Sequence, residues 1–564
     1  MNAKFRVAAT GLSLAALAGL VLLIVRPSLN PARVQPLSLL IGAWIAFLTA
    51  AWLLRKVPRR TAVALILLGG IAVQAAAVSA PPQMSTDLYR YIWDGRVQAA
   101  GVDPYQDVPA ATQLDGLRNE FLFYPRGEYC VKASYVTRHP AADLTPGCTR
   151  INRPAVPTIY PPVAEAYFLG VYYLHPADDS STPIQATTAL AAVLITVLLL
   201  FGLGRLGRDV RTAALWSWCP TVALEAGNNA HVDVIAVGIA AVAILLLATA
   251  RTTRRTVLGG VLLGLAIATK LTPVLTVPAV LARGDDCAFS RGGSTLPDPP
   301  GSASSRGGST PPDPPGRLPR QGMRRRWVTV LAAAGSAFIA VYVPHVVRVG
   351  GKVIGFLPGY LQQEGYTRGT RFGIIGLVVS GPLAIAVAVL ILAAVAFAVL
   401  QFTDPDRPWS GAVVMTAAAL AVATPHYQWY SLLLVMLVAL DGRPEWLAFA
   451  AGGYYAADPG LGRYTPPSRL VDAIAYGVPL VIVGVGWLIR SELARRAAAA
   501  EPPPAAAVAT SATTAPAATT AEAPTTATAI ATATATPDLT MLNPAVGPVL
   551  IGPDVPGADR QVRV

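Results

Sequence analysis

Long apolar runs recur along most of the chain and are separated by short polar stretches. The runs lie at 8–25, 36–54 and 61–80, and then near 185–204, 212–226, 232–250, 256–283, 327–345, 374–402, 410–424, 429–440, 445–457 and 470–489. A helix needs about 20 apolar residues to cross the ~30 Å hydrocarbon core of a bilayer. The pattern therefore predicts an all-α protein, a polytopic bundle of about twelve to fourteen transmembrane helices.

The first run follows the basic segment MNAKFR, and a cleaved signal peptide has the same two components. Cleavage would need small residues after the run, which instead ends in Arg26, Pro27 and Ser28. We therefore expect an uncleaved first span.

Basic residues indicate the orientation of the spans. Arg55, Lys56, Arg59 and Arg60 follow the second run, and positive loops stay in the cytoplasm. The third run then delivers the chain to the outer side, where 81–183 holds eight Lys or Arg against eleven Asp or Glu. The basic C-terminal flank after residue 489 indicates a cytoplasmic tail.

The apolar segment 159–174 is too short for an ordinary span and begins with Pro161 and Pro162. If it were a span, the basic loop 205–211 would lie outside. We therefore expect a helix in the membrane interface.

Composition supports a membrane protein, with 53% hydrophobic and 13% charged residues and a mean hydropathy of +0.50. The net charge of +13 lies largely in short loops, so we expect no nucleic-acid partner. Two Pro-rich segments cannot form a core. They divide the chain into an N-terminal transmembrane region (1–283), a cytoplasmic linker (284–326) with the duplicated units RGGSTLPDPPG and RGGSTPPDPPG, a C-terminal transmembrane region (327–490), and a cytoplasmic tail (491–564).

Four cysteines are too few for a disulfide scaffold. Cys130 and Cys148 share the outer loop, where an oxidising compartment favours a disulfide. Cys219 lies in a span and Cys287 in the cytoplasmic linker, so we expect both to be free thiols.

A helix starting near Asp87 carries the first candidate site. Asp87, Arg90, Tyr91 and Asp94 follow at i, i+3, i+4 and i+7 and so share one face. This acid–base cluster at the membrane boundary indicates chemistry, with Asp87 as general base and Asp94 as a structural partner of Arg90. Alternatively, the carboxylates simply face water, or Asp87 complements the helix dipole.

Two further candidates lie on the outer side. Asn228, His231 and Asp233 form a polar apex between spans, either as a cavity wall or as a turn in which Asn229 caps the next helix. Their spacing does not suit a metal, so we expect none. Lys270 interrupts an apolar run, which marks a ligand site or a lysine that snorkels to the interface.

Two outer loops complete the set. In GYTRGTRF, Arg368 and Arg371 are either phosphate ligands or ordinary surface arginines. In TPHYQWY, His426 and Tyr427 provide a titratable group and an aromatic one, or only an aromatic belt.

These motifs together resemble the GT-C superfamily of integral-membrane glycosyltransferases that use polyprenyl-phosphate sugars. The nearest resemblance, over roughly 60–490, is to family 87 and to α-1,6-mannopyranosyltransferases. The motifs are Asp87 with Tyr91, Gly101-Val-Asp-Pro-Tyr105, Tyr160-Pro161-Pro162, Asn228–Asp233, Gly264–Pro273 and the Pro425-His426 loop.

The resemblance implies an inverting mannosyltransferase of the cell membrane, acting on a lipid-linked or cell-envelope glycan on the extracytoplasmic side. By this resemblance Asp87 would be the base and His426 would assist at the donor phosphate. Lys270, Arg368 and Arg371 are cations on the same side and are available to stabilise the departing phosphate. No cofactor is expected, since the polyprenyl-phosphate sugar is a substrate that carries its own leaving group. The cavity would be lined by Arg90, Tyr91, Asp94, Tyr160, Asn228, His231, Asp233 and Tyr427.

Two other functions fit some of the pattern. A transporter or flippase of a lipid-linked sugar would also need a polar cavity, but the two halves of the chain share no repeat. A non-catalytic scaffold would leave the outer polar cluster unexplained.

Overall fold

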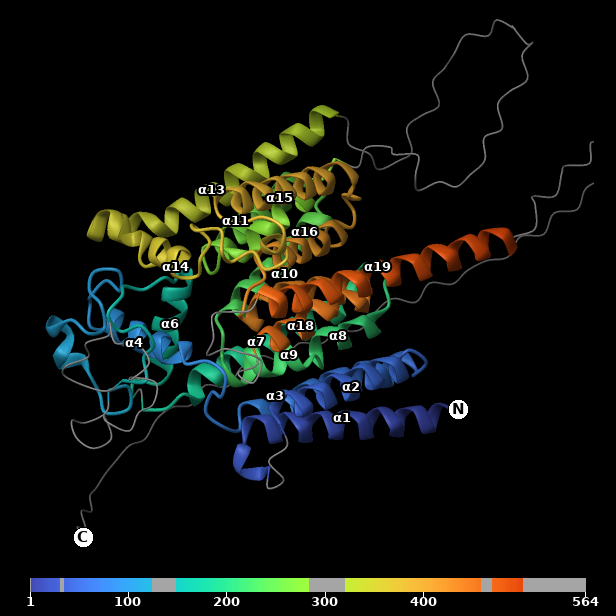
Figure 1. The fold of residues 1–564 in the computed structure, drawn as a ribbon, viewed down its shortest axis with the longest axis horizontal. Helices are drawn as coiled ribbons and strands as arrows, with labels where there is room; N and C mark the ends of the chain where they lie inside the picture. The colour runs from blue at the N-terminus through green and yellow to red at the C-terminus, as the bar shows by residue number, and fades with distance from the viewer. Residues whose placement is uncertain are drawn as a thin grey trace, which may run out of the picture. The chain divides into compact units, whose positions relative to one another are not determined.

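The computed structural model describes residues 2–30, 35–123, 149–177, 179–283, 320–457 and 469–500. Within these ranges the chain forms helices and turns without a β-strand, and Phe123 and Thr149 make an isolated antiparallel bridge. Figure 1 shows the arrangement of the helices. Their bounds are α1 Ala3–Val25, α2 Pro36–Leu54, α3 Arg59–Ala77, α4 Asp87–Ala99, α6 Pro162–Leu174, α7 Thr182–Arg205, α8 Ala214–Ser217, α9 Pro220–Val222, α10 Asp233–Ala248, α11 Thr253–Ile267, α12 Val277–Val280, α13 Arg320–Val349, α14 Leu357–Gln363, α15 Pro382–Phe402, α16 Pro408–Ala423, α17 Leu432–Asp441, α18 Ala448–Ala457 and α19 Arg469–Ala500.

The predicted all-α membrane bundle is confirmed, but fewer helices than predicted are long enough to cross a bilayer. Among the described residues seven are, and an eighth span is possible if Pro220–Asn228 and Asp233–Ala248, which bend by 119°, count as one. Most other predicted spans are helical but short, such as α16 and α17. Prolines, which lack a backbone donor, lie at several of the breaks, as Pro273 does in the short turn that follows α11.

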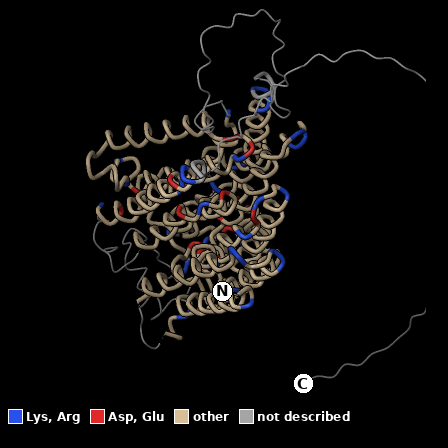
Figure 2. The backbone as a smooth tube through the Cα atoms, turned by 90° about the vertical axis from the view of Figure 1, so that its right-hand side faces the viewer, with Lys and Arg blue, Asp and Glu red and all other residues tan. Residues whose placement is uncertain are grey.

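Loops of the described chain meet at each end of α3. At one end Arg211 donates to the Val57 carbonyl at 2.6 Å, and Arg208 donates to that of Asp441 at 2.9 Å. At the other end Asn229 accepts from the Met84 amide at 3.1 Å. The 19 residues of α3, about 28 Å, separate these ends. Figure 2 shows how sparse charged residues are along the helices.

α4 and α6 pack together at the Met84 end, and α6 also contacts the long helices α7 and α13 (Figure 1). Gly95 permits this contact, because a Cβ there would lie 2.5 Å from the Phe168 carbonyl oxygen. α6 has 13 residues, about 20 Å, too short to cross a bilayer. This length agrees with the interfacial helix expected for 159–174.

α4 is covered by neighbouring elements. Its Tyr91 and Trp93 are 0% and 1% exposed, because α6 and the segment around Phe123 cover them. The helix is therefore buried along most of its length.

Helical structure extends past two of the expected boundaries, because α13 begins at Arg320 and α19 continues to Ala500. Cys219 is buried and free, as expected. The predicted Cys130–Cys148 disulfide, Cys287, the duplicated units and the tail beyond residue 500 lie outside the described residues.

Candidate active site

Asp87 is the first residue of α4, and its side chain is 17% exposed. The backbone amide of Asp87 donates to Ser85 Oγ at 3.2 Å, so Ser85 rather than Thr86 supports the start of the helix. Asn152 Nδ2 donates to Asp87 Oδ1 at 2.5 Å. No described Lys or Arg forms an ion pair with Asp87, whose side chain is partly exposed.

Arg90 and Asp94 pair with each other, as predicted. Arg90 Nε lies 2.8 and 3.0 Å from the two oxygens of Asp94, and the side chains are only 5% and 2% exposed. Arg90 also donates to the Val156 carbonyl at 3.0 Å. The pair is therefore a structural element of α4, and Asp87 stands apart from it.

Glu165 of α6 completes this buried cluster, and the sequence reasoning missed it. Its oxygens accept from Thr158 Oγ1 at 2.7 Å and from Gln98 Nε2 at 3.0 Å. Burial, followed by the nearby charge of Asp94, raises the pKa of Glu165 well above its ordinary value. Its surroundings thus favour the neutral form of Glu165.

His231 lies in the bend before α10, between two carboxylates. Its Nδ1 is 3.8 Å from Asp87 Oδ2 and its Nε2 is 3.4 Å from Glu225 Oε2. Glu225, absent from the predicted site, accepts from Tyr454 at 2.8 Å and from Asn229 at 3.0 Å. The signal for Glu225 was its place in the same polar apex as His231.

Asn228 and Asn229 fasten the segment that leads to Asp87. Asn228 Nδ2 donates to the Ala77 carbonyl at 3.0 Å, and Asn228 Oδ1 accepts from the Gln83 amide at 3.0 Å. Asn229 does not cap α10, whose N-cap residue is Val232. The apex therefore positions the start of α4 instead.

Lys270 lies at the break after α11 and pairs with Asp233, the first residue of α10. Its Nζ is 3.0 Å from Asp233 Oδ2 and lies 5.4 and 5.8 Å from the ring centres of Tyr160 and Tyr430. The lysine side chain is 17% exposed. The predicted break of this apolar run is present, and Lys270 is held at it by a carboxylate and two rings.

The two predicted arginines differ. Arg371 is 6% exposed, and its Nη1 lies 2.9 Å from His426 Nδ1 and 3.4 Å from Glu364 Oε2. Arg368, which precedes it in the same loop, is exposed. Only Arg371 is built into a network.

His426 and Tyr427 belong to the same network. His426 Nε2 lies 2.7 Å from Asp472 Oδ1, and the Tyr427 hydroxyl donates to Glu364 Oε1 at 2.7 Å. Burial and the charge of Glu364 raise the pKa of Tyr427 to about 12, so this donor stays protonated at neutral pH. Sequence reasoning missed Glu364 and Asp472, which come from segments distant from His426.

Trp429 connects the two groups of residues. Its ring stacks on His231, with centroids 3.8 Å apart, and on Tyr427, with centroids 4.7 Å apart. The Asp87 side and the Arg371 side are therefore neighbouring portions of one region.

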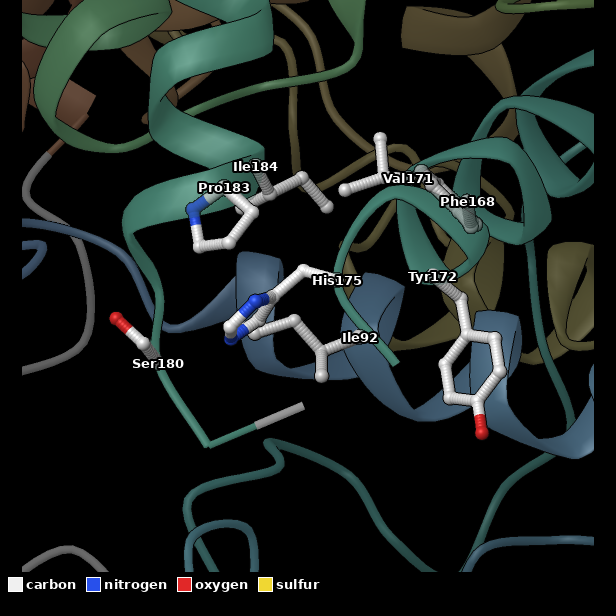
Figure 3. A pocket seen from close by; sticks show the side chains of 8 residues that line it. All are labelled: Ile92, Phe168, Val171, Tyr172, His175, Ser180, Pro183 and Ile184. Atoms are coloured by element: carbon white, nitrogen blue, oxygen red, sulfur yellow. The ribbon is translucent and has the colours of Figure 1, made fainter. Parts of the chain in front are cut away.

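A pocket between α4, α6 and α7 lies apart from these charged groups. Its mostly apolar lining includes Ile92, Phe168, His175 and Ile184 (Figure 3). Within the described residues, no group of three or more His, Cys, Asp or Glu side chains is arranged to hold a metal.

Two family models match this chain. That of glycosyltransferase family 87 matches residues 158–295, and that of the α-(1→6)-mannopyranosyltransferase N-terminal domain matches residues 3–120. The predicted family resemblance is confirmed. Each match covers well under half of the chain, and both models describe glycosyltransferases, one of them a mannopyranosyltransferase. The matches include Asp87, His231 and Lys270 and exclude Arg371 and His426.

Two crystal structures of the Archaeoglobus fulgidus oligosaccharyltransferase are partially similar. The one tethered to an acceptor peptide has 12% identity and a TM-score of 0.31, and covers 76% of this chain and 54% of its own. The one with zinc and sulfate has 14% identity and a TM-score of 0.29, and covers 73% and 53%. This chain thus spans about half of the archaeal protein. No curated protein matches.

Proposed function

We propose that this protein transfers mannose from a polyprenyl-phosphate donor to a hydroxyl group of a lipid-linked or cell-envelope glycan. The observation that carries the proposal is Asp87, a partly exposed carboxylate without a cationic partner among the described residues. It lies in one region with Lys270 and Arg371, which suit a phosphate.

The reaction is a displacement at the anomeric carbon of mannose. Asp87 takes the proton of the acceptor hydroxyl while the hydroxyl oxygen bonds to that carbon. The bond from the carbon to the phosphate oxygen breaks, and its electron pair stays on the phosphate. A single displacement of this kind inverts the configuration.

The donor side of the site supplies positive charge. Lys270 and Arg371 stabilise the departing polyprenyl phosphate, with Arg368 at the exposed edge of the same loop as Arg371. Both Lys270 and Arg371 have carboxylate partners, Asp233 and Glu364, which hold them in place before the donor arrives. His426 acts on this side, in contact with Arg371.

The acceptor side lies around Asp87. His231 is its neighbour in the cluster, and Asn228 shapes it through the backbone before α4. Tyr160, beside Lys270, and Tyr427, beside Glu364, lie toward the donor side. Arg90, Tyr91 and Asp94 are buried and support it from within α4.

We place the site on the extracytoplasmic side of the cell membrane, and the C-terminal tail in the cytoplasm, because basic loops gather at the opposite end. Cysteines at the exposed positions Glu120 and Arg254 test this placement. An impermeant thiol reagent on intact cells should label Glu120→Cys and leave Arg254→Cys unlabelled, as read by mass spectrometry at each site. The reverse labelling would contradict it.

The activity is tested with purified protein in detergent, labelled polyprenyl-phosphate mannose, and candidate glycolipid or glycan acceptors. We expect labelled mannose on the acceptor and free polyprenyl phosphate. A flippase would instead move the intact donor across liposomes without consuming it, and that result would overturn the proposal.

A further inference from the structure

The hydrogen bonds around His426 define its protonation. An arginine guanidinium donates hydrogen bonds and cannot accept them. Arg371 Nη1 lies 2.9 Å from His426 Nδ1, so Nδ1 is an acceptor and carries no proton. The proton is on Nε2, which donates to Asp472 Oδ1 at 2.7 Å. His426 is therefore a neutral ring with both nitrogens in use.

This arrangement does not suit a proton-transfer group. If His426 took a proton on Nδ1, it would lose its bond to Arg371, and if it gave up the proton on Nε2, it would lose its bond to Asp472. The ring instead connects α19, through Asp472, to the Arg371 loop. Thr424, two residues before His426, also accepts the Gly373 amide at 2.9 Å and donates to the Arg371 carbonyl at 2.8 Å.

Arg371 has an unpaired hydrogen-bond donor. Its Nε is buried and has no hydrogen-bond partner among the described residues. An unpaired buried donor costs about 1–3 kcal/mol, a cost that an anionic oxygen would remove. Glu364 lies 3.4 Å from Nη1 and is itself held by the Tyr427 hydroxyl, so it only partly neutralises the guanidinium.

We propose that His426 is a positioning residue that, held by Asp472, orients the Arg371 guanidinium toward the donor phosphate. The proposal rests on the proposed function, which places Arg371 at that phosphate. It assigns Asp472 and His426 to donor affinity and leaves proton transfer to Asp87.

A double-mutant cycle tests it, with polyprenyl phosphate as the probe and binding measured in detergent. Arg371→Met should weaken binding about 10- to 100-fold, the range for losing hydrogen bonds to a charged group, and His426→Ala about tenfold. Because His426 acts only through Arg371, the double variant should bind no more weakly than Arg371→Met. If the loss of binding in the double variant equals the product of the two single losses, the proposal is overturned.

Two conservative variants separate positioning from general loss of structure. Asn at 426 places an amide oxygen near the position of Nδ1, whereas Gln places its amide near Nε2. His426→Asn should therefore bind polyprenyl phosphate within about threefold of wild type, and His426→Gln should resemble His426→Ala. Equal losses in both would contradict orientation through Nδ1. Arg371→Lys, which keeps the charge, covers the case in which Arg371→Met fails to fold.

His345 provides a matched control. Its Nδ1 lies 2.8 Å from Asp103 Oδ2, a similar histidine–aspartate pair outside this network. His345→Asn should leave polyprenyl-phosphate affinity unchanged, and a loss equal to that of His426→Ala would contradict a specific role for His426. If Arg371→Met itself binds normally, the donor side of the proposed function fails. If it binds weakly and the cycle is multiplicative, only the role of His426 fails.

Discussion

Asp87 and Asp94 lie two turns apart on α4 and have opposite surroundings. The Asp94 side chain is 2% exposed, and both of its oxygens accept a hydrogen bond from Arg90 Nε. Asp87 is 17% exposed, and a neutral amide, Asn152, is its hydrogen-bond donor from another side chain.

This difference indicates which of the two carboxylates can act in acid–base chemistry. A carboxylate paired with a buried arginine loses an ion pair if it accepts a proton, and the arginine is left uncompensated. Asp87 has no such partner in the described residues and can bind a proton without breaking a buried pair. Asp94 therefore stabilises the helix, and Asp87 serves the reaction.

The largest expected effect is on the buried pair. Asp94→Ala leaves Arg90 buried without its partner and should cost about 3–5 kcal/mol of folding free energy. Thermal unfolding in detergent measures it. Asp87→Ala is the control on the same helix and should cost about 1 kcal/mol or less. Equal losses would remove the distinction between the two carboxylates.

Lys270 extends the comparison to the cations. Lys270→Met keeps the length of the side chain but removes the charge, so the KM for the donor should rise about tenfold and turnover should fall. Lys352, an exposed lysine 3.4 Å from the Gln106 carbonyl, is the control. Lys352→Met should leave the donor KM unchanged, and an equal rise in both variants would indicate a general charge effect.

The smallest expected effect concerns pH. Burial raises the pKa of Glu165 in the folded protein above its value in the unfolded chain, so the folded state binds the proton more tightly. This stabilisation is full below the ordinary pKa of about 4.3 and falls as pH rises toward the raised value. The glutamine of Glu165→Gln cannot ionise. Between pH 5 and pH 8 the melting temperature of this variant should therefore fall less than that of wild type, and the two decreases should differ by on the order of 2 °C. An unchanged pH dependence would show that Glu165 does not titrate in this range.

The sequence was enough to predict most helices. Hydrophobic length carries that information locally, as the break of the run at Lys270 illustrates. The number of long helices could not be read in this way, because α8 to α10 form a bent chain of short pieces.

The sequence predicted the candidate residues better than their partners. Arg90 with Asp94 was found because i and i+4 are neighbours on one helix. Glu364 and Asp472 were missed because they reach Arg371 and His426 from other elements, and periodicity carries no information about such contacts. The sequence also could not distinguish Arg371 from Arg368, which share one loop motif. In the structure Arg371 is buried and Arg368 is exposed.

The most direct test of the central claim is the turnover of Asp87→Asn. Asparagine keeps the shape of the side chain and its ability to hydrogen-bond but cannot take the acceptor proton. Transfer of labelled mannose should fall about 100-fold or more, while polyprenyl-phosphate binding and the melting temperature stay near those of wild type. Transfer by Asp87→Asn at close to the wild-type rate would contradict Asp87 as the general base.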